Sequence, residues 1–131
     1  MTDDALATAE RFYALLDADE IEEFLGLCAE DVEVRYPAAG MLPYGGTWLG
    51  RDGVARFLDA HEEAEEILEF DHGPMFAGGD TVLVLGRFTG RARKSGRTWS
   101  TRFVHALTIA DGHVRRWEAF FDTASAVAAR S

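Results

Sequence analysis

The sequence predicts an α+β fold in which helices cover one face of a mostly antiparallel sheet. Three observations carry this prediction. The first half of the chain contains three segments with apolar residues at helical spacing, the second half contains successive segments with strand-like alternation, and glycine-containing turns separate the later strands. Helices concentrated in the first half of the chain and strands in the second half indicate a layer of helices packed on a sheet around one core.

The composition indicates one globular domain that spans residues 1–131. A chain of 131 residues is long enough for one buried core but too short for two. With 47% hydrophobic and 27% charged residues, its composition is ordinary for a soluble globular protein. A formal net charge of −10 argues against nucleic acid and anionic membrane as partners. The acidic N-terminus differs from a basic signal peptide, and no apolar run approaches the roughly 18 residues of a membrane span. Because the single cysteine, Cys28, excludes an internal disulfide, we expect a cytoplasmic protein.

Two helices are expected before the first strand. Residues 4–18 show three- and four-residue spacing, which predicts a helix whose buried face holds Leu6, Ala9, Phe12, Tyr13 and Leu16. Asp19 and Glu22 form a variant of the capping box, which begins a second helix whose apolar face holds Ile21, Phe24, Leu25 and Cys28. Together the two helices would form a hairpin that lies across a sheet.

The middle of the chain predicts a strand, an irregular loop and a third helix. Residues 31–36 alternate until Pro37 stops the strand, so Tyr36 ends it on the buried side. The loop 37–50 contains the large residues Met41, Leu42, Tyr44 and Trp48, and we interpret it as a flap over a pocket. The helix, about residues 52–63, carries His61 on its apolar side, either as a pocket residue or as a boundary histidine with a hydrogen-bond partner.

The next segments predict a solvated helix end and two strands. We interpret the acidic run Glu62, Glu63, Glu65 and Glu66 as the solvated end. Residues 68–77 contain Pro74 and predict an edge strand, whereas residues 81–88 predict a strand buried on both faces. Six basic residues gather around the next strand connection: Arg87, Arg91, Arg93, Lys94, Arg97 and Arg102. They would form either a solvated hairpin tip or a positive rim that steers anionic substrates.

The stretch from Trp99 to Asp122 predicts a β-hairpin with a histidine on its apolar face. Residues 99–110 alternate strictly, and one side holds Trp99, Thr101, Phe103, His105, Leu107 and Ile109. A two-residue turn, Asp111-Gly112, would place His105 opposite Glu118, whereas a three-residue loop that includes Ala110 would place it opposite Trp117. We favour the three-residue loop, because it sets Gly112 in the left-handed position of a bulged turn. His105 would then share a wall with Phe103, Trp117, Ala119 and Phe121.

Four stretches follow one another in an order and spacing that resemble a known superfamily. They are Arg11-Phe12-Tyr13 to Leu16, Ala29-Glu30-Asp31-Val32 to Pro37, Gly46-Thr47-Trp48-Leu49-Gly50-Arg51-Asp52-Gly53-Val54, and Asp111-Gly112-His113-Val114 through Phe121-Asp122. They resemble the SnoaL-like and ketosteroid-isomerase-like branch of the nuclear transport factor 2-like superfamily. The resemblance implies a curved sheet packed against three helices as a cone-shaped half-barrel. Its open interior would bind a small, largely apolar molecule, usually within a homodimer.

The resemblance also shows which residues of this chain occupy the catalytic positions of three groups of enzymes in the superfamily. The tyrosine, the base and the protonated aspartate of ketosteroid isomerase fall on Phe12, Tyr36 and His105. The catalytic aspartates of limonene epoxide hydrolases fall on Leu83 and Ala119, which cannot activate water. SnoaL-like cyclases use an aspartate as acid and base, and Asp122 is the nearest match, although strand parity points it away from the His105 face.

The residues themselves suit proton abstraction beside a carbonyl group. A histidine among aromatic side chains is suited to act as a base or proton shuttle, because burial disfavours its charged form. Tyr36 would donate a hydrogen bond to a developing enolate oxygen. The resemblance adds Asp122 as a further candidate acid. The predicted pocket residues are Phe12, Tyr13, Tyr44, Trp48, Phe103, Trp117, Ala119 and Phe121.

No cofactor or metal is implied, because the four histidines lack paired ligand spacing and no nucleotide-binding motif is present. The leading hypothesis is a cofactor-independent isomerase, cyclase or dehydratase that acts on a small apolar carbonyl compound through His105. One alternative is a non-catalytic protein that binds a small ligand in the same pocket. Another is a dimeric interaction domain whose pocket is filled by its own side chains.

Overall fold

The computed structural model describes residues 2–131, without the side chains of residues 2 and 3, so Met1 of the expected domain lies outside the described residues. Three helices occupy the first half of the chain: α1 (Thr2–Asp17), α2 (Ile21–Leu27) and α3 (Gly50–Ala64). The strands are β1 (Cys28–Tyr36), β2 (Gly46–Leu49), β3 (Glu65–Gly78), β4 (Thr81–Ala92), β5 (Thr98–Ala110) and β6 (His113–Phe121). A short helix, α4 (Thr123–Ala128), follows the last strand.

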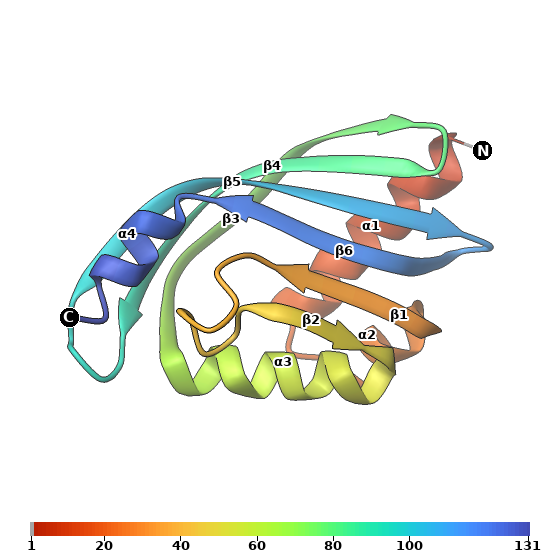
Figure 1. Cartoon of the computed structure of the whole chain (residues 1–131). Coiled ribbons are helices and arrows are strands. Elements are labelled where there is room, and N and C mark those ends of the chain that lie inside the picture. The colour runs from red at the N-terminus through yellow and green to blue at the C-terminus, as the bar shows by residue number, and fades with distance from the viewer. Residues whose placement is uncertain (1) are drawn as a thin grey trace.

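The six strands form one strongly curved, unclosed sheet in the order β2-β1-β6-β5-β4-β3. Strands β1 and β6 are parallel, and the other neighbours are antiparallel. Figure 1 shows that β3 bends until its start joins α3, while α1 and α3 lie on the inner side of the curve. The expected α+β class, with three helices against a curved and mostly antiparallel sheet, is confirmed.

Aromatic side chains join the helices to the sheet. The Phe12 ring on α1 lies 4.5 Å from Phe24 on α2 and 5.1 Å from Trp117 on β6. Phe57 on α3 packs 5.4 Å from the same indole, nearly perpendicular to it. Such edge-on contacts add to the apolar area that these rings bury. The helical spacing in the sequence therefore identified the face on which the helices meet the sheet.

Several local predictions were wrong, for identifiable reasons. The capping box does not form: Asp19 has a φ of 57°, and Glu20 precedes α2 without a side-chain cap. Strand β4 is not buried on both faces, because the outer face of the sheet is open and leaves Leu83 41% exposed. Strand β2 and helix α4 lie in segments where no regular element was expected.

The turn between β5 and β6 has two residues, so the favoured three-residue loop is wrong. Ala110 pairs with His113, and both Asp111 and Gly112 have positive φ, at 54° and 72°, as a two-residue hairpin turn of type I′ requires. The pairing register then shifts by one residue between Ile109 and Thr108, as in a β-bulge.

The bulge, rather than the turn, sets the register of the wall around His105. His105 pairs with Ala119, instead of with Trp117 or Glu118. A two-residue turn by itself would have moved the even-numbered residues of β6 to the inner side. The extra residue in the bulge reverses this change, so Trp117, Ala119 and Phe121 still face the inner side with His105. The predicted wall is present, although the geometry that creates it differs.

Neighbouring atoms from β3 and β5 approach the backbone closely at Gly86 on β4. A Cβ atom at this position would lie 2.2 Å from the carbonyl oxygen of Asp71 and 2.3 Å from the ring of Phe103. Gly86→Ala should therefore lower the free energy of unfolding by about 2 kcal/mol, through overpacking against backbone. Gly78→Ala is the matched control, because nothing lies within 4 Å of its Cβ position. Equal stability of the two variants in urea denaturation would contradict this packing.

Candidate functional site

The inner side of the curved sheet encloses a narrow cavity of about 30 Å³. Its walls are mostly aromatic, and its polar groups include His61, Thr101 and His105. A wider groove of about 670 Å³ opens beside it, between the α1–α2 connection, α3 and β3. Tyr36, His61, Phe70 and Phe88 line both spaces, so the cavity is the inner end of the groove. The groove has the size of a small-molecule site, whereas the inner cavity alone is too small.

His105 lies at this inner end and is held by Tyr13. The imidazole comes from β5 and is 3% exposed, and its Nδ1 lies 2.7 Å from the Tyr13 hydroxyl on α1. The Phe103 ring stacks at 4.3 Å from the imidazole, and Trp117 packs against it at 5.7 Å. His105 is thus held by a hydrogen bond and by the aromatic rings packed around it.

The bond to Tyr13 determines which ring nitrogen of His105 carries the proton. A buried hydroxyl needs an acceptor, and the acceptor that Tyr13 has among the described residues is His105 Nδ1. Burial, together with His72, lowers the pKa of His105 to about 3, so the ring is neutral at pH 7. Its one proton therefore resides on Nε2, the nitrogen left for a ligand. This arrangement favours His105 as a hydrogen-bond donor over the base role expected from the sequence.

Tyr36 supplies a second donor to the same space. It ends β1 and lies half-buried, with its ring 4.6 Å from Phe57 and 6.4 Å from His105. Burial raises its pKa, so the hydroxyl keeps its proton. In the part of the chain that the structure describes, residues 2–131, no hydrogen bond engages this hydroxyl. Tyr36 is therefore placed as the sequence predicted.

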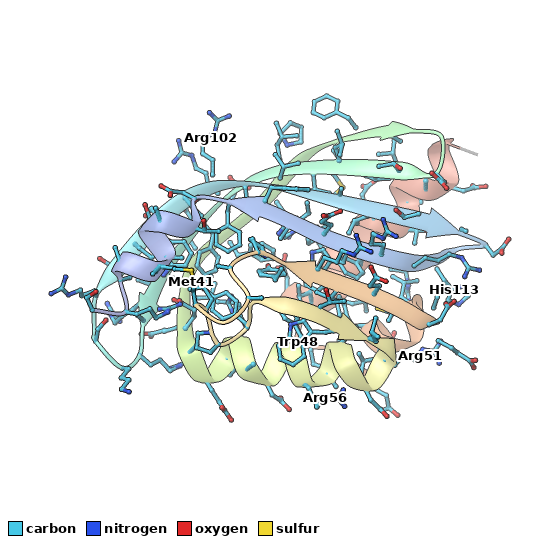
Figure 2. All side chains as sticks on the ribbon, viewed as in Figure 1. Met41, Trp48, Arg51, Arg56, Arg102 and His113 are labelled. Atoms are coloured by element: carbon cyan, nitrogen blue, oxygen red, sulfur yellow. The ribbon has the colours of Figure 1, made fainter. Side chains whose placement is uncertain are left out.

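The other predicted pocket residues divide into two groups. Tyr44, Phe103 and Phe121 line the cavity, and Trp117 lines the groove. Phe12, Tyr13 and Ala119 are buried in the core, where Tyr13 acts through its hydrogen bond to His105. Trp48, labelled in Figure 2, donates its indole N–H to the Tyr44 carbonyl at 3.1 Å and packs on α3, so it lines neither space.

The loop 37–50 is anchored more firmly than a flap. Leu42 and Tyr44 are buried at 3% and 1% exposure, whereas Met41 is 63% exposed. Tyr44 forms part of the cavity wall, so the loop contributes fixed wall residues rather than a free cover.

Asp122 does not face the cavity. Its carboxylate is exposed and caps α4, accepting bonds from the Ser125 hydroxyl at 2.6 Å and the Ser125 amide at 3.2 Å. These bonds lower the pKa of Asp122, as expected at an N-cap. The geometry therefore places the candidate cyclase acid outside the cavity, because β6 ends at Phe121 and Asp122 follows it as the N-cap of α4.

Glu65 was expected to be solvated but is fully buried beside the cavity. It begins β3 directly after α3, and its carboxylate accepts bonds from Tyr44 at 3.2 Å and from Trp99 at 3.0 Å. The Arg130 guanidinium also pairs with it. Nothing in the acidic run distinguishes this residue, because its partners come from distant parts of the chain.

His61 is a pocket residue, which was one of the two roles that the sequence left open. Its ring packs 4.5 Å from Tyr44 and 5.8 Å from Phe88, and it lines both the cavity and the groove. Burial, assisted by Arg130, lowers its pKa to about 4. The helical spacing of Val54, Phe57, Leu58 and His61 was the signal that could have assigned it to the site.

The basic residues near the β4–β5 turn do not line this site. Arg91 and Arg93 form exposed ion pairs with Glu66 and Glu62, at 2.6 and 3.1 Å. Figure 2 shows Arg102 pointing outward, away from α3. A positive rim around the cavity is therefore not formed, and the solvated tip is the better interpretation.

Among residues 2–131, no cluster of three or more histidine, cysteine or acidic residues is arranged to hold a metal ion. None of the described helices has the length and apolarity needed to cross a membrane.

The chain belongs to the SnoaL-like domain family, whose family model matches residues 9–117. Its structure is similar to that of an NTF2-like protein from Burkholderia xenovorans, with 27% identity, a TM-score of 0.91, and coverage of 100% of this chain and 98% of that chain. TerC, co-crystallized with polyporic acid, shares 30% identity at a TM-score of 0.81, over 92% of this chain and 93% of its own. A proposed SnoaL-like polyketide cyclase from Mesorhizobium loti shares the fold at 16% identity and a TM-score of 0.75, over 92% and 99% of the two chains. No curated protein matches the sequence.

The neutral state of His105 predicts a specific dependence of stability on pH. Its pKa falls from 6.5 to about 3 on folding, so between these values the unfolded chain binds a proton that the folded chain does not. Acidification below pH 6.5 should therefore destabilise the fold, with a contribution from His105 that approaches ~1.4 kcal/mol per pH unit. In His105→Gln this contribution is absent, and the unfolding free energy should fall less steeply.

The exposed His113 provides the control, since it lies at the β5–β6 turn (Figure 2). Denaturant titrations of His113→Gln from pH 7 to pH 4 should parallel the wild type. Parallel curves for wild type and His105→Gln would instead show that His105 titrates normally.

Proposed function

We propose that this chain is a single SnoaL-like domain that binds a small, largely apolar carbonyl compound and catalyses its isomerisation, cyclisation or dehydration without a cofactor. The observation that carries the proposal is the pair of neutral donors, His105 and Tyr36, in a mostly aromatic cavity at the inner end of a groove of about 670 Å³. Membership of the SnoaL-like family supports it. So does the similarity to TerC, which was crystallized with polyporic acid.

The two donors suit a reaction in which negative charge develops on an oxygen atom. Removal of a proton beside a carbonyl transfers charge to the carbonyl oxygen, which becomes an enolate. The His105 Nε2–H and the Tyr36 hydroxyl would then bond that oxygen in a cavity that excludes most water. Hydrogen bonds aimed at developing charge in such surroundings lower the barrier more than they would in water.

The small size of the inner cavity favours the two non-catalytic alternatives. At about 30 Å³ it holds little more than a water molecule, so its own aromatic side chains fill most of the interior. A non-catalytic binding protein that uses only the outer groove, or a dimeric interaction domain with no ligand, fits this feature. Movement of Phe70 or Phe88, which line both spaces, would be needed for a substrate to reach His105.

We also propose that the protein is a cytoplasmic homodimer. Phe76, Leu83 and Phe120 are 56%, 41% and 52% exposed on the face of the sheet that the helices do not cover. Phe76 and Leu83 are directly opposite each other on β3 and β4. Exposed apolar patches of this kind are typical of protein interfaces.

Deuterium uptake by 2-tetralone, a bicyclic ketone with acidic hydrogens beside its carbonyl, tests the proposed chemistry. In D₂O at pH 7, the wild-type protein should bind the ketone in calorimetry and accelerate exchange followed by proton NMR. His105→Gln and Tyr36→Phe should each reduce the protein-dependent rate about 100-fold, as expected for loss of one donor to an oxyanion. His113→Gln should leave the rate unchanged.

The other outcomes decide between the alternatives. Binding of 2-tetralone or polyporic acid without any exchange would contradict catalysis of this type and support a binding protein. The absence of binding by both compounds would contradict a small-molecule site and support an interaction domain.

A further inference from the structure

The two hydrogen-bond donors in the cavity account for the carbonyl oxygen of the substrate but not for the base that removes its proton. Proton abstraction needs a base, but His105 offers an N–H and Tyr36 a protonated hydroxyl. Tyr44 also lines the cavity, and its hydroxyl is already bonded to Glu65 and Arg130. A base must therefore come from another group that a substrate in the groove can touch.

The carboxylates along the groove are poorly placed for this role. Asp17 and Glu62 have side chains 48% and 73% exposed, and they pair with His72 and Arg93. Asp19 and Asp59 also line the groove but are exposed to water. None of these four lines the inner cavity with His105.

We propose that His61 is the catalytic base of this site, accepting the proton from the carbon beside the substrate carbonyl while His105 and Tyr36 hold the carbonyl oxygen. This inference rests on the function proposed above. His61 comes from the last turn of α3, whereas His105 comes from β5, so the two imidazoles reach the cavity from different layers of the fold.

The surroundings of His61 place it where the groove meets the cavity. It lines both spaces, with aromatic rings packed around it at 4.5 Å (Tyr44), 5.8 Å (Phe88) and 6.2 Å (Phe57). Within residues 2–131, no side-chain hydrogen bond occupies either of its ring nitrogens. One nitrogen of the neutral ring therefore keeps a lone pair that a bound molecule can meet.

The charges near His61 keep it neutral before the reaction and change its affinity for a proton during the reaction. Burial, and then the Arg130 guanidinium, hold its pKa at about 4. Glu65 pairs with that guanidinium, and Glu62 lies on the same helix as His61. An enolate formed beside the ring would add a negative charge and so stabilise the imidazolium.

The proton balance of the cycle is complete with these groups. The substrate C–H bond breaks, its proton forms an N–H bond on His61, and its electron pair becomes the enolate double bond. In an isomerisation, the same proton returns to another carbon of the conjugated system, which restores the carbonyl and neutral His61. In a dehydration, it would leave with a departing hydroxyl as water.

His61→Gln tests this assignment in the same 2-tetralone assay. The substitution keeps a polar side chain but removes the base, so deuterium uptake should fall at least 100-fold. The dissociation constant for 2-tetralone should change less than about threefold, since the carbonyl donors remain. His113→Gln should preserve both quantities.

Chemical rescue separates a catalytic role from a structural one. Added imidazole should restore exchange in His61→Ala but not in His105→Gln, because only the first variant lacks the proton acceptor.

Undiminished exchange in His61→Gln, with an active wild type, would overturn the role of His61 while the proposed function stands. A wild type without exchange would overturn both. If either variant fails to fold, a wild-type rate that rises through about pH 4 and is level from pH 6 to 8 supports His61, and a rate that rises near pH 6.5 contradicts it.

Discussion

The hydrogen bond between Tyr13 and His105 is the interaction on which the proposed site depends. A phenol and an imidazole, both buried, would each cost free energy without a partner, and here each satisfies the other at 2.7 Å. The bond also ties α1 to β5, through two residues that lie 92 positions apart in the chain. Because it fixes the tautomer as well as the position of the ring, one contact contributes both to the core and to the chemistry of the cavity.

A buried ion pair stabilises the other side of the cavity. Glu65 is fully buried, so an unpaired carboxylate there would cost several kcal/mol. Three donors offset this cost, and they come from three separate segments: Tyr44, Trp99 and Arg130. The segment after β6 is thereby joined to the start of β3. Burial, assisted by the same guanidinium, also lowers the pKa of His61 and keeps its ring neutral. The same contacts thus hold the C-terminal helix in place and influence a candidate base.

The sequence predicted the layers of the fold better than the contacts of the site. The helical spacing and the strand alternation of apolar residues correctly located the three helices, the edge strand and the apolar face of the hairpin, because each pattern is set by residues close together in the sequence. His105 and Tyr36 were placed correctly for the same reason. The partners were not predictable, since the Tyr13–His105 bond and the burial of Glu65 depend on residues far apart in sequence. The bulge between Thr108 and Ile109 was also missed. The shorter turn and the bulge cancel in their effect on which β6 side chains face inward, so the predicted wall did not reveal either of them.

The central claim is that His105 presents a neutral Nε2–H to the cavity, and nitrogen NMR of the ¹⁵N-labelled protein tests it most directly. Long-range proton–nitrogen correlations, assigned by comparison with His105→Gln, distinguish protonated from unprotonated ring nitrogens. From pH 8 down to pH 5, Nδ1 should give the signal of an unprotonated acceptor and Nε2 that of a protonated donor. A proton on Nδ1, or a positively charged ring at pH 6, would contradict the account.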